Sequence, residues 1–119
     1  MAAVSKGAAG EVLAARYLRD NDYDLLAANY HCRFGEIDII AADDEYIIFV
    51  EVKTRRPDAR YTPREAVTAD KQERIVKTAA LYLQRYPTDL QQRFDVIEVT
   101  SDPTDPLKAL QIQHLKNAF

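Results

Sequence analysis

Charged residues interrupt two segments of the chain that are rich in Ile, Val and Phe. Among them, Asp38 lies inside GEIDII after Glu36, and Glu51 and Lys53 lie inside FVEVKTR. A buried carboxylate without a partner is costly, so these side chains either face water or form a site. Carboxylate oxygens hold Mg²⁺, and a lysine beside them can orient or deprotonate water or stabilise charge that develops at phosphorus. The three residues together therefore suit metal-dependent phosphodiester hydrolysis.

The two segments are predicted to form an antiparallel hairpin, because only a short polar tip separates them. Side chains alternate along a strand, so Glu36 and Asp38 share one face and Glu51 and Lys53 share one face. With a turn centred on Asp43–Asp44, we expect Glu36 directly opposite Glu51 and Asp38 one diagonal step away. A three-residue turn would instead separate the two pairs onto different faces.

An ordinary alternative stays open for these residues. A Glu-x-Lys pair on a half-exposed strand is common, and cross-strand ion pairs contribute little to a sheet. Glu11 favours a site, because it precedes Ala15 and Leu18 at helical spacing and so shares their apolar face or its edge. A carboxylate at that place needs a reason to be there.

Length and composition indicate one domain over residues 1–119. The chain has 119 residues, 47% hydrophobic and 29% charged, which is typical of a globular protein with one core. No apolar run approaches the ~18 residues of a membrane span, and the N-terminal segment lacks the apolar region of a secretory signal. Cys32 is the only cysteine, so neither an internal disulfide nor a Cys-based zinc site can form. We expect a cytoplasmic protein without membrane contact.

The charge is unevenly distributed. A formal net charge of −3 argues against coating nucleic acid through bulk electrostatics. From Lys53 to Lys77, however, eight Lys and Arg residues stand against four Asp and Glu residues, a local net charge of +4. This stretch is either a solvated loop followed by the outer face of a helix or a surface that holds phosphates.

Hydrophobic periodicity predicts an α/β protein of order αβββαββ. The expected elements are a helix from an N-cap at Ser5 to Asp20, strands over 23–33, 35–42 and 46–54, a short helical turn beginning at Pro63, a helix over 68–86, a strand from Arg93 and a strand over 107–115. The expected inward residues are Ala8, Val12, Ala15 and Leu18 in the first helix and Ile75, Ala79, Tyr82 and Leu83 in the long one. The long helix should connect the third and fourth strands as a right-handed crossover and make them parallel, giving a mixed sheet covered by helices.

Several motifs resemble one protein family over nearly the whole chain. They are KGAAGEVLAARYL, GEIDII, FVEVKTR, REAVTADKQERIVKTAALYL, RFDVIEV and the closing KNAF. Together they resemble the YraN family of small bacterial proteins, regarded as distant relatives of archaeal Holliday junction resolvases within the PD-(D/E)xK restriction-endonuclease-like superfamily. The resemblance implies a restriction-endonuclease-like fold, with a mixed β-sheet flanked by helices.

The resemblance also implies roles for particular residues. Asp38 and Glu51 would be the metal carboxylates, Lys53 the catalytic lysine, the main-chain carbonyl of Val52 a further metal ligand, and Glu11 the carboxylate that completes the site. The chain departs from the superfamily pattern at one place, where Ile37 stands before the aspartate instead of proline.

The function implied is a Mg²⁺- or Mn²⁺-dependent endonuclease that acts on DNA, with structured or branched DNA as the expected substrate. The expected nucleic-acid-binding residues are Arg33, Arg55, Arg56, Arg60, Lys71, Gln72, Arg74 and Lys77, and Tyr61 lies in the same basic loop. A homodimer is expected too, because related resolvases act as two-fold dimers. Two alternatives stay open: a DNA-binding or adaptor module that keeps the fold without turnover, and a purely structural partner-binding domain.

Four other residues of reactive types are not assigned to the site. His31 and His114 lack the paired spacing of metal ligands, and Cys32 is interpreted as a small buried thiol. Asp95 is interpreted as structural, paired with Arg93 or with a neighbouring loop.

Overall fold

The computed structural model describes residues 6–58 and 67–119. The elements are α1 (Lys6–Asp20), β1 (Asp24–Cys32), β2 (Gly35–Ala42), β3 (Tyr46–Arg55), α2 (Ala69–Arg85), β4 (Gln91–Asp102) and β5 (Asp105–Leu115). The predicted order αβββαββ is therefore confirmed, with each of these elements within a few residues of its expected position. The predicted cap at Ser5, the turn at Pro63 and the basic-loop residues Arg60 and Tyr61 lie outside the described residues.

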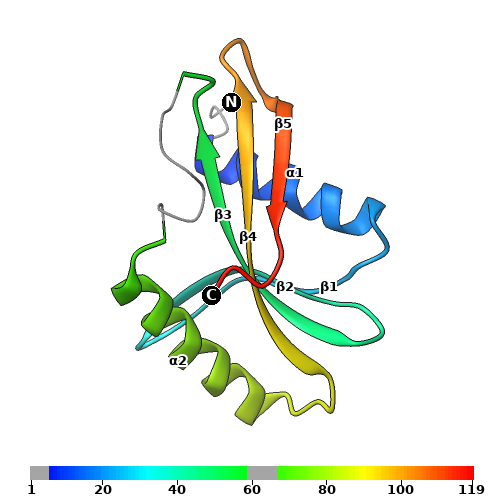
Figure 1. The fold of residues 1–119 in the computed structure, drawn as a ribbon, viewed down its shortest axis with the longest axis vertical. Helices are drawn as coiled ribbons and strands as arrows, with labels where there is room; N and C mark the ends of the chain where they lie inside the picture. Colours follow the sequence, from blue (N-terminus) through cyan, green and yellow to red (C-terminus); the bar gives the residue numbers. More distant parts are fainter. Residues whose placement is uncertain (1–5, 59–66) are drawn as a thin grey trace, which may run out of the picture.

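The five strands form one mixed sheet in the order β1-β2-β3-β4-β5. Three neighbouring pairs are antiparallel, while β3 and β4 are parallel, as expected when a helix connects them. Figure 1 shows β2 and β3 side by side near the turn that joins them and diverging toward their other ends. Backbone pairing of β2 with β3 covers only Ile39 to Ala42 of β2, so the sheet forks beside Asp38.

The register of the β2–β3 hairpin corrects the sequence prediction. Asp43 accepts hydrogen bonds at its side chain from the backbone N–H groups of Glu45, at 2.8 Å, and Tyr46, at 2.7 Å. Its own N–H donates to the Tyr46 carbonyl. The turn is therefore centred on Asp44 and Glu45, one place later than predicted. Moving the turn by one place moves each cross-strand partner by two residues. The side chains therefore stay on the predicted faces of the sheet, but each residue of β2 faces a different residue of β3.

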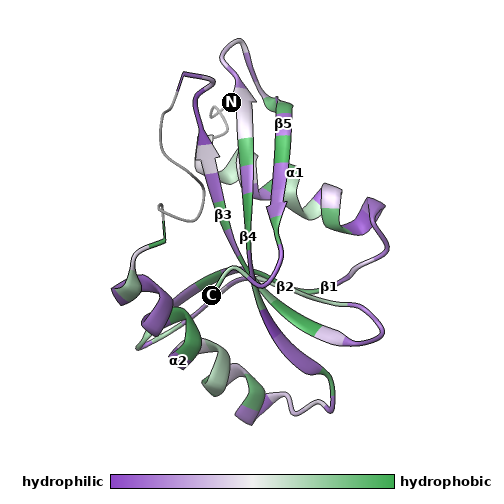
Figure 2. Ribbon diagram, in the orientation of Figure 1, coloured by the Kyte–Doolittle hydropathy of each residue, from purple (hydrophilic) through white to green (hydrophobic). Residues whose placement is uncertain are grey.

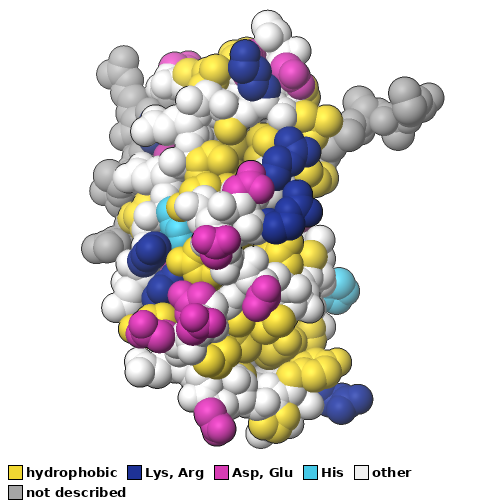
Figure 3. Space-filling model, turned by 90° about the vertical axis from the view of Figure 1, so that its right-hand side faces the viewer, with side chains coloured by type: hydrophobic (Ala, Val, Ile, Leu, Met, Phe, Trp, Pro, Cys, Tyr) yellow, Lys and Arg dark blue, Asp and Glu magenta, His cyan; other side chains and the backbone are white. Residues whose placement is uncertain are grey.

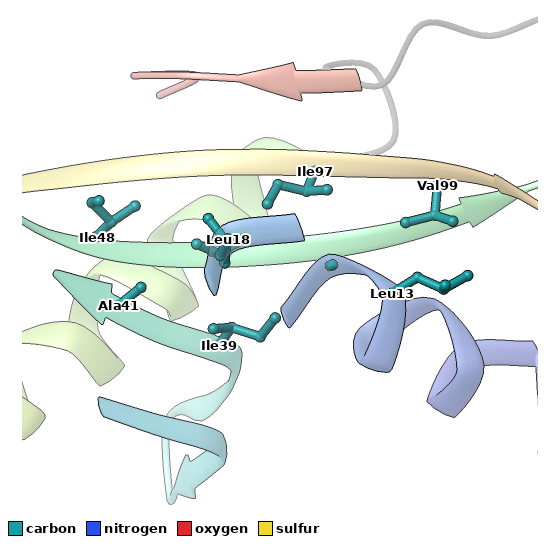
Figure 4. Packing of buried hydrophobic residues seen from close by; sticks show 9 residues of the cluster. Leu13, Leu18, Ile39, Ala41, Ile48, Ile97 and Val99 are labelled. Carbon is teal, nitrogen blue, oxygen red and sulfur yellow. The ribbon is translucent and has the colours of Figure 1, made fainter. Parts of the chain in front are cut away.

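Helix α1 covers one face of the sheet, and its packing corrects a second prediction. Figure 4 shows Leu13 and Leu18 of α1 against Ile39, Ile48 and Val99 of three strands. These residues are almost completely buried. The predicted inward residues Ala8 and Val12 are exposed, Val12 by 45%. The stripe is rotated by about one residue, because Ala9, Leu13 and Ala14 face the strands instead.

Helix α2 packs on the opposite side, mainly against β2. Ile75, Ala79 and Tyr82 are buried in a second core with Phe49 and Val96, in agreement with the predicted stripe. The helix begins after the N-cap Thr68, whose side chain accepts from the Lys71 N–H, and ends before Pro87. Figure 2 shows hydrophilic and hydrophobic residues alternating along β4 and β5. Neither of the two described helices is long and apolar enough to span a membrane.

Candidate metal centre

Asp38 and Glu51 meet where the sheet forks. Ile39 pairs with Val50 in the register of β2 and β3, so the next position places Asp38 across from Glu51. The ladder ends there, and the Val52 N–H donates to Asp38 Oδ2 at 2.8 Å instead of to a backbone carbonyl of β2. Glu51 is buried, with 4% of its surface exposed. The predicted pair of carboxylates therefore converges, with Asp38 rather than Glu36 directly facing Glu51.

Two further carboxylates join Asp38. Oxygen atoms of Glu11 on α1 and of Glu36 and Asp38 on β2 lie within 4.8 Å of one another. The close approach of α1 to β3 brings Glu11 there: a Cβ on Gly10 would overlap the Thr54 side chain at Oγ1. A glycine at this position avoids the overlap and allows the close approach. The helix thus carries the adjacent Glu11 across to the fork, as the sequence predicted for this residue.

Asn29 on β1 holds two of these carboxylates. With its amide oriented so that the nitrogen faces them, it donates to Glu11 Oε2 at 3.0 Å and Glu36 Oε1 at 3.3 Å. Asn29 lies at the register position opposite Asp38 and has φ 53°, a conformation that asparagine adopts more readily than most residues. Sequence analysis missed Asn29, and its only signal was its place in the β1–β2 register.

Glu51 carries two cationic partners. Lys71 Nζ, from the first turn of α2, lies 2.5 Å from Glu51 Oε1, and Lys53 Nζ lies 3.5 Å from the same oxygen. The two lysines thus compensate the charge of a buried carboxylate that would otherwise be costly. Asp38, Glu11 and Glu36 have no ion pair of this kind in the part of the chain that the structure describes.

The electrostatic consequence appears in the pKa values of the cluster. Burial and the negative charges of Glu51 and Glu11 raise the pKa of Asp38 from 3.8 to about 7, against the opposing Val52 hydrogen bond. Burial lowers the pKa of Lys53, and the neighbouring Lys71 lowers it further. Burial acts in the same direction on Lys71, but the hydrogen bond and charge of Glu51 raise its pKa overall. Carboxylates that repel each other in this way form a site that favours a cation.

A cleft of about 420 Å³ opens onto the cluster, and its lining includes Glu36, Asp38, Glu51, Lys71 and Arg74. It lies between the fork of the sheet and the first turns of α2. A larger cavity of about 560 Å³ lies elsewhere, beside the β4–β5 turn, with three prolines in its lining. Of these two spaces, the smaller cleft is the one that the carboxylates and Lys71 line.

The predicted nucleic-acid-binding residues have diverse surroundings. The contacts are Arg55 with Glu98 at 2.9 Å, Arg56 with Asp58 at 3.5 Å, Arg74 with Asp70 at 3.0 Å, Lys77 with Glu73 at 3.1 Å, Arg33 over the Phe34 ring at 4.8 Å, and Gln72 Nε2 with the Val67 carbonyl at 3.0 Å. Lys71 and Arg74 line the cleft itself. Arg60 lies outside the described residues, and for Val52 the recorded contact is made by its N–H rather than its carbonyl.

A second charged cluster is buried on the α1 side of the sheet. Asp95, fully buried, accepts from the Arg93 guanidinium at 2.9 to 3.2 Å, lies 2.6 Å from His114 Nε2, and accepts from the Asn117 N–H at 2.9 Å. His114 Nδ1 lies 3.0 Å from the Tyr17 hydroxyl. This arrangement confirms the structural interpretation of Asp95 and its pairing with Arg93. His31 is exposed, and Cys32 is half-buried rather than buried.

Comparison with known proteins places the chain in a family. Residues 10–99 match the uncharacterised protein family UPF0102. A UPF0102 protein of Syntrophus aciditrophicus is 47% identical over 114 residues, covering 95% of this chain and 87% of the relative. UPF0102 proteins of Nocardia farcinica and Symbiobacterium thermophilum are 48% and 47% identical, covering 95% of this chain and 87% and 94% of the relatives. The chain therefore belongs to UPF0102, the YraN family whose motifs its sequence carries.

Proposed function

We propose that this protein is a metal-dependent endonuclease that hydrolyses phosphodiester bonds in DNA. The observation that carries the proposal is the convergence of Asp38, Glu51 and Glu11 beside Lys53 at the fork of the sheet. Placement in the PD-(D/E)xK superfamily is part of the same proposal. Branched DNA is the substrate class to test first, because the sequence resembles junction resolvases.

The donor set fits a hard divalent cation. The grouped atoms are carboxylate oxygens, the ligands that Mg²⁺ and Mn²⁺ prefer. The raised pKa of Asp38 indicates that its charge lacks compensation without such an ion. Asp38 and Glu11 would hold the ion, with Glu51 and the Val52 carbonyl as the further ligands that the family resemblance implies. When bound, the ion would neutralise the scissile phosphate and acidify a water molecule.

The lysines supply the remaining chemistry. Lys53 lies next to Glu51 on the same face of β3, so its ammonium is placed to orient water or to stabilise negative charge near the phosphate. Its lowered pKa brings proton exchange closer to neutral pH. Lys71 and Arg74 at the edge of the cleft are placed to contact the flanking phosphates.

Affinity for duplex DNA should be modest and salt-sensitive. The net charge is −3, and on the face shown in Figure 3 acidic and basic side chains are interspersed. Several predicted phosphate ligands also have acidic neighbours, such as Asp70 beside Arg74. Few phosphates would then be neutralised, which keeps the affinity modest, and the contacts that do form are electrostatic, so they weaken as the salt concentration rises.

The test is a cleavage assay with branched, flapped and duplex DNA in Mg²⁺ or Mn²⁺. We expect the wild type to cut branched DNA and the Asp38→Ala, Glu51→Ala double variant to be inactive. Equal activity of the two proteins would contradict the proposal, because it would assign the cleavage to a contaminant.

A second variant separates the endonuclease from a DNA-binding module without turnover. Lys53→Ala removes the ammonium but leaves the carboxylates in place, so we expect it to abolish cleavage while DNA and Mn²⁺ binding persist. DNA binding by the wild type with no cleavage of any substrate would favour the binding module instead. No salt-dependent DNA binding at all would favour a partner-binding domain.

A further inference from the structure

One carboxylate of the cleft has more cationic neighbours than it can use with a metal ion bound. Glu51 Oε1 lies 2.5 Å from Lys71 Nζ and 3.5 Å from Lys53 Nζ. A single oxygen atom thus serves both ammonium groups. If a divalent cation is to bind Glu51, at least one of these groups has to give way, because cations repel each other at such distances.

Lys71 is the lysine whose side chain has room to move away from Glu51. It extends from the first turn of α2, where its N–H donates to the N-cap Thr68 at 3.2 Å, so its backbone is fixed while its side chain spans the cleft. The Lys71 side chain is 43% exposed and Lys53 25% exposed. Lys53 lies two residues from Glu51 on the same strand, and its side chain is the less exposed of the two. Lys71 is therefore the lysine that we expect to leave Glu51 by rotating its side chain toward solvent.

The charges of the cluster favour such an exchange. Four carboxylates (Glu11, Glu36, Asp38 and Glu51) and two lysines leave a formal charge of −2 when all are ionised. We propose that Lys71 is an internal counter-ion that a divalent cation displaces from Glu51, and that the released ammonium then contacts a phosphate of the substrate. The inference rests on the proposed metal-dependent function and assigns Lys71 a place in it as a counter-ion of Glu51 that becomes a phosphate-binding residue.

The test compares the Mn²⁺ affinities of matched lysine variants by calorimetric titration. Lys71→Met removes the competing charge, so we expect Mn²⁺ to bind about tenfold more tightly than to the wild type, a coupling of about 1.4 kcal/mol. Lys108→Met makes the same change on the exposed face of β5 and should leave the affinity unchanged. Lys71→Arg keeps the cation and should bind Mn²⁺ as the wild type does.

Unchanged or weaker Mn²⁺ binding by Lys71→Met would overturn the exchange. If Lys71 instead held Glu51 in place for the ion, its removal would weaken Mn²⁺ binding, and if Lys71 had no role, its removal would leave Mn²⁺ binding unchanged. A thermal melt of each variant first establishes that it folds. A charge effect spread over the whole protein would tighten binding in Lys71→Met and Lys108→Met alike, and this result would also overturn the proposal.

A DNA-binding measurement tests the second half of the exchange. Without divalent ions Lys71 is engaged with Glu51, so Lys71→Met should bind DNA as the wild type does. With Ca²⁺ present to limit cleavage, we expect the variant to bind several-fold more weakly, because the released ammonium is missing. An equal loss with and without Ca²⁺ would overturn the release step.

The failures of the two proposals are distinguishable. Tighter Mn²⁺ binding by Lys71→Met without cleavage of any substrate by the wild type would support the exchange and overturn the nuclease. Cleavage with unchanged Mn²⁺ affinity in Lys71→Met would do the reverse. Absence of Mn²⁺ binding in every variant would overturn the exchange, whatever the cleavage assay gives.

Discussion

Asp95 and Asp38, two aspartates of the sheet, differ in how their charge is compensated. Asp95, on the α1 side, is surrounded by donors: burial opposes ionisation, but His114, Arg93 and the Asn117 N–H lower its pKa below the ordinary value. Asp38, at the fork, has one backbone donor and three carboxylate neighbours, Glu11, Glu36 and Glu51, and burial together with the charges of Glu51 and Glu11 raises its pKa to about 7. The same residue type is thus satisfied at one place and left in need of a cation at the other.

This difference separates the compensated cluster around Asp95 from the candidate metal centre around Asp38. Burial alone does not mark a site, because Asp95 is more deeply buried than Asp38. What marks the site is the excess of like charge, which a folding protein would ordinarily avoid. Strongly raised carboxyl pKa values in a cleft are more frequent at functional sites than in structural networks. The contrast makes opposite predictions for substitutions at the two aspartates.

The largest effect is expected for Asp95→Ala. The substitution leaves Arg93 and His114 buried without their shared carboxylate, and breaking a buried ion pair from one side costs about 3–5 kcal/mol. Urea unfolding followed by circular dichroism measures this loss. Asp89→Ala, on an exposed turn, serves as the control and should change the stability by less than about 0.5 kcal/mol. A similar small change for Asp95→Ala would contradict its structural role.

The next effect is a gain of stability in Asp38→Asn, measured without divalent ions. A carboxyl group whose pKa is raised on folding binds its proton more tightly in the folded protein. For Asp38 the resulting contribution to the free energy of unfolding is fully present below the unfolded pKa, near 3.8, and is lost as pH rises through about 7. The neutral amide does not titrate. The melting temperature of the variant should therefore exceed that of the wild type by an amount that grows between pH 4 and 7 and then levels off.

Asp95 provides the opposite pH dependence as an internal comparison. Its lowered pKa stabilises the folded protein above the unfolded pKa, and that contribution is lost as pH falls through the lower folded value.

Addition of Mn²⁺ should reduce the difference in melting temperature between Asp38→Asn and the wild type at pH 8, because the ion stabilises only the protein that carries the carboxylate. A difference in melting temperature that stays constant at all pH values would contradict the raised pKa of Asp38.

The fold was largely predictable from the sequence because its signals are local. Alternating apolar residues defined β2 and β3, and Pro87 and Thr68 bounded α2, so the order αβββαββ followed. The inward stripe of α1 was not predictable in the same way. Alanine is common throughout that helix, and its small side chains leave the helical face ambiguous until the packing of Leu13 and Leu18 is known.

The candidate site was predictable in its residue types and less so in its pairing. Asp38, Glu51 and Lys53 stood out as charges in apolar strands, and Glu11 as a charge on an apolar helix. The register depended on a hydrogen bond of the Asp43 side chain to Tyr46, which sequence does not specify. Contacts between elements distant in sequence, such as those of Gly10 and Asn29, were also hidden, because nothing local requires them.

Gly10 offers a prediction of intermediate size about how Glu11 is positioned. In Gly10→Ala the new Cβ would overlap the Thr54 side chain at Oγ1, so either Thr54 or α1 has to shift, at a cost of about 1–3 kcal/mol for overpacking. We expect α1 to move and to carry Glu11 with it, so the Mn²⁺ affinity should fall. Gly7→Ala, in the same helix with open space at its Cβ, should instead stabilise by about 0.5–1 kcal/mol and leave ion binding unaltered.

The smallest effect is expected at Asn29, which holds two carboxylates without itself being a candidate ligand. Asn29→Gly keeps the backbone conformation at φ 53° but removes the amide that donates to Glu11 and Glu36. Loss of such an outer hydrogen bond should weaken Mn²⁺ binding by about tenfold. Asn117→Gly is the matched control, since its φ is 56° and only its backbone N–H contacts Asp95. Equal Mn²⁺ affinities of the two glycine variants would show that the carboxylates at the fork keep their positions without Asn29, and that repulsion rather than hydrogen bonding sets their geometry.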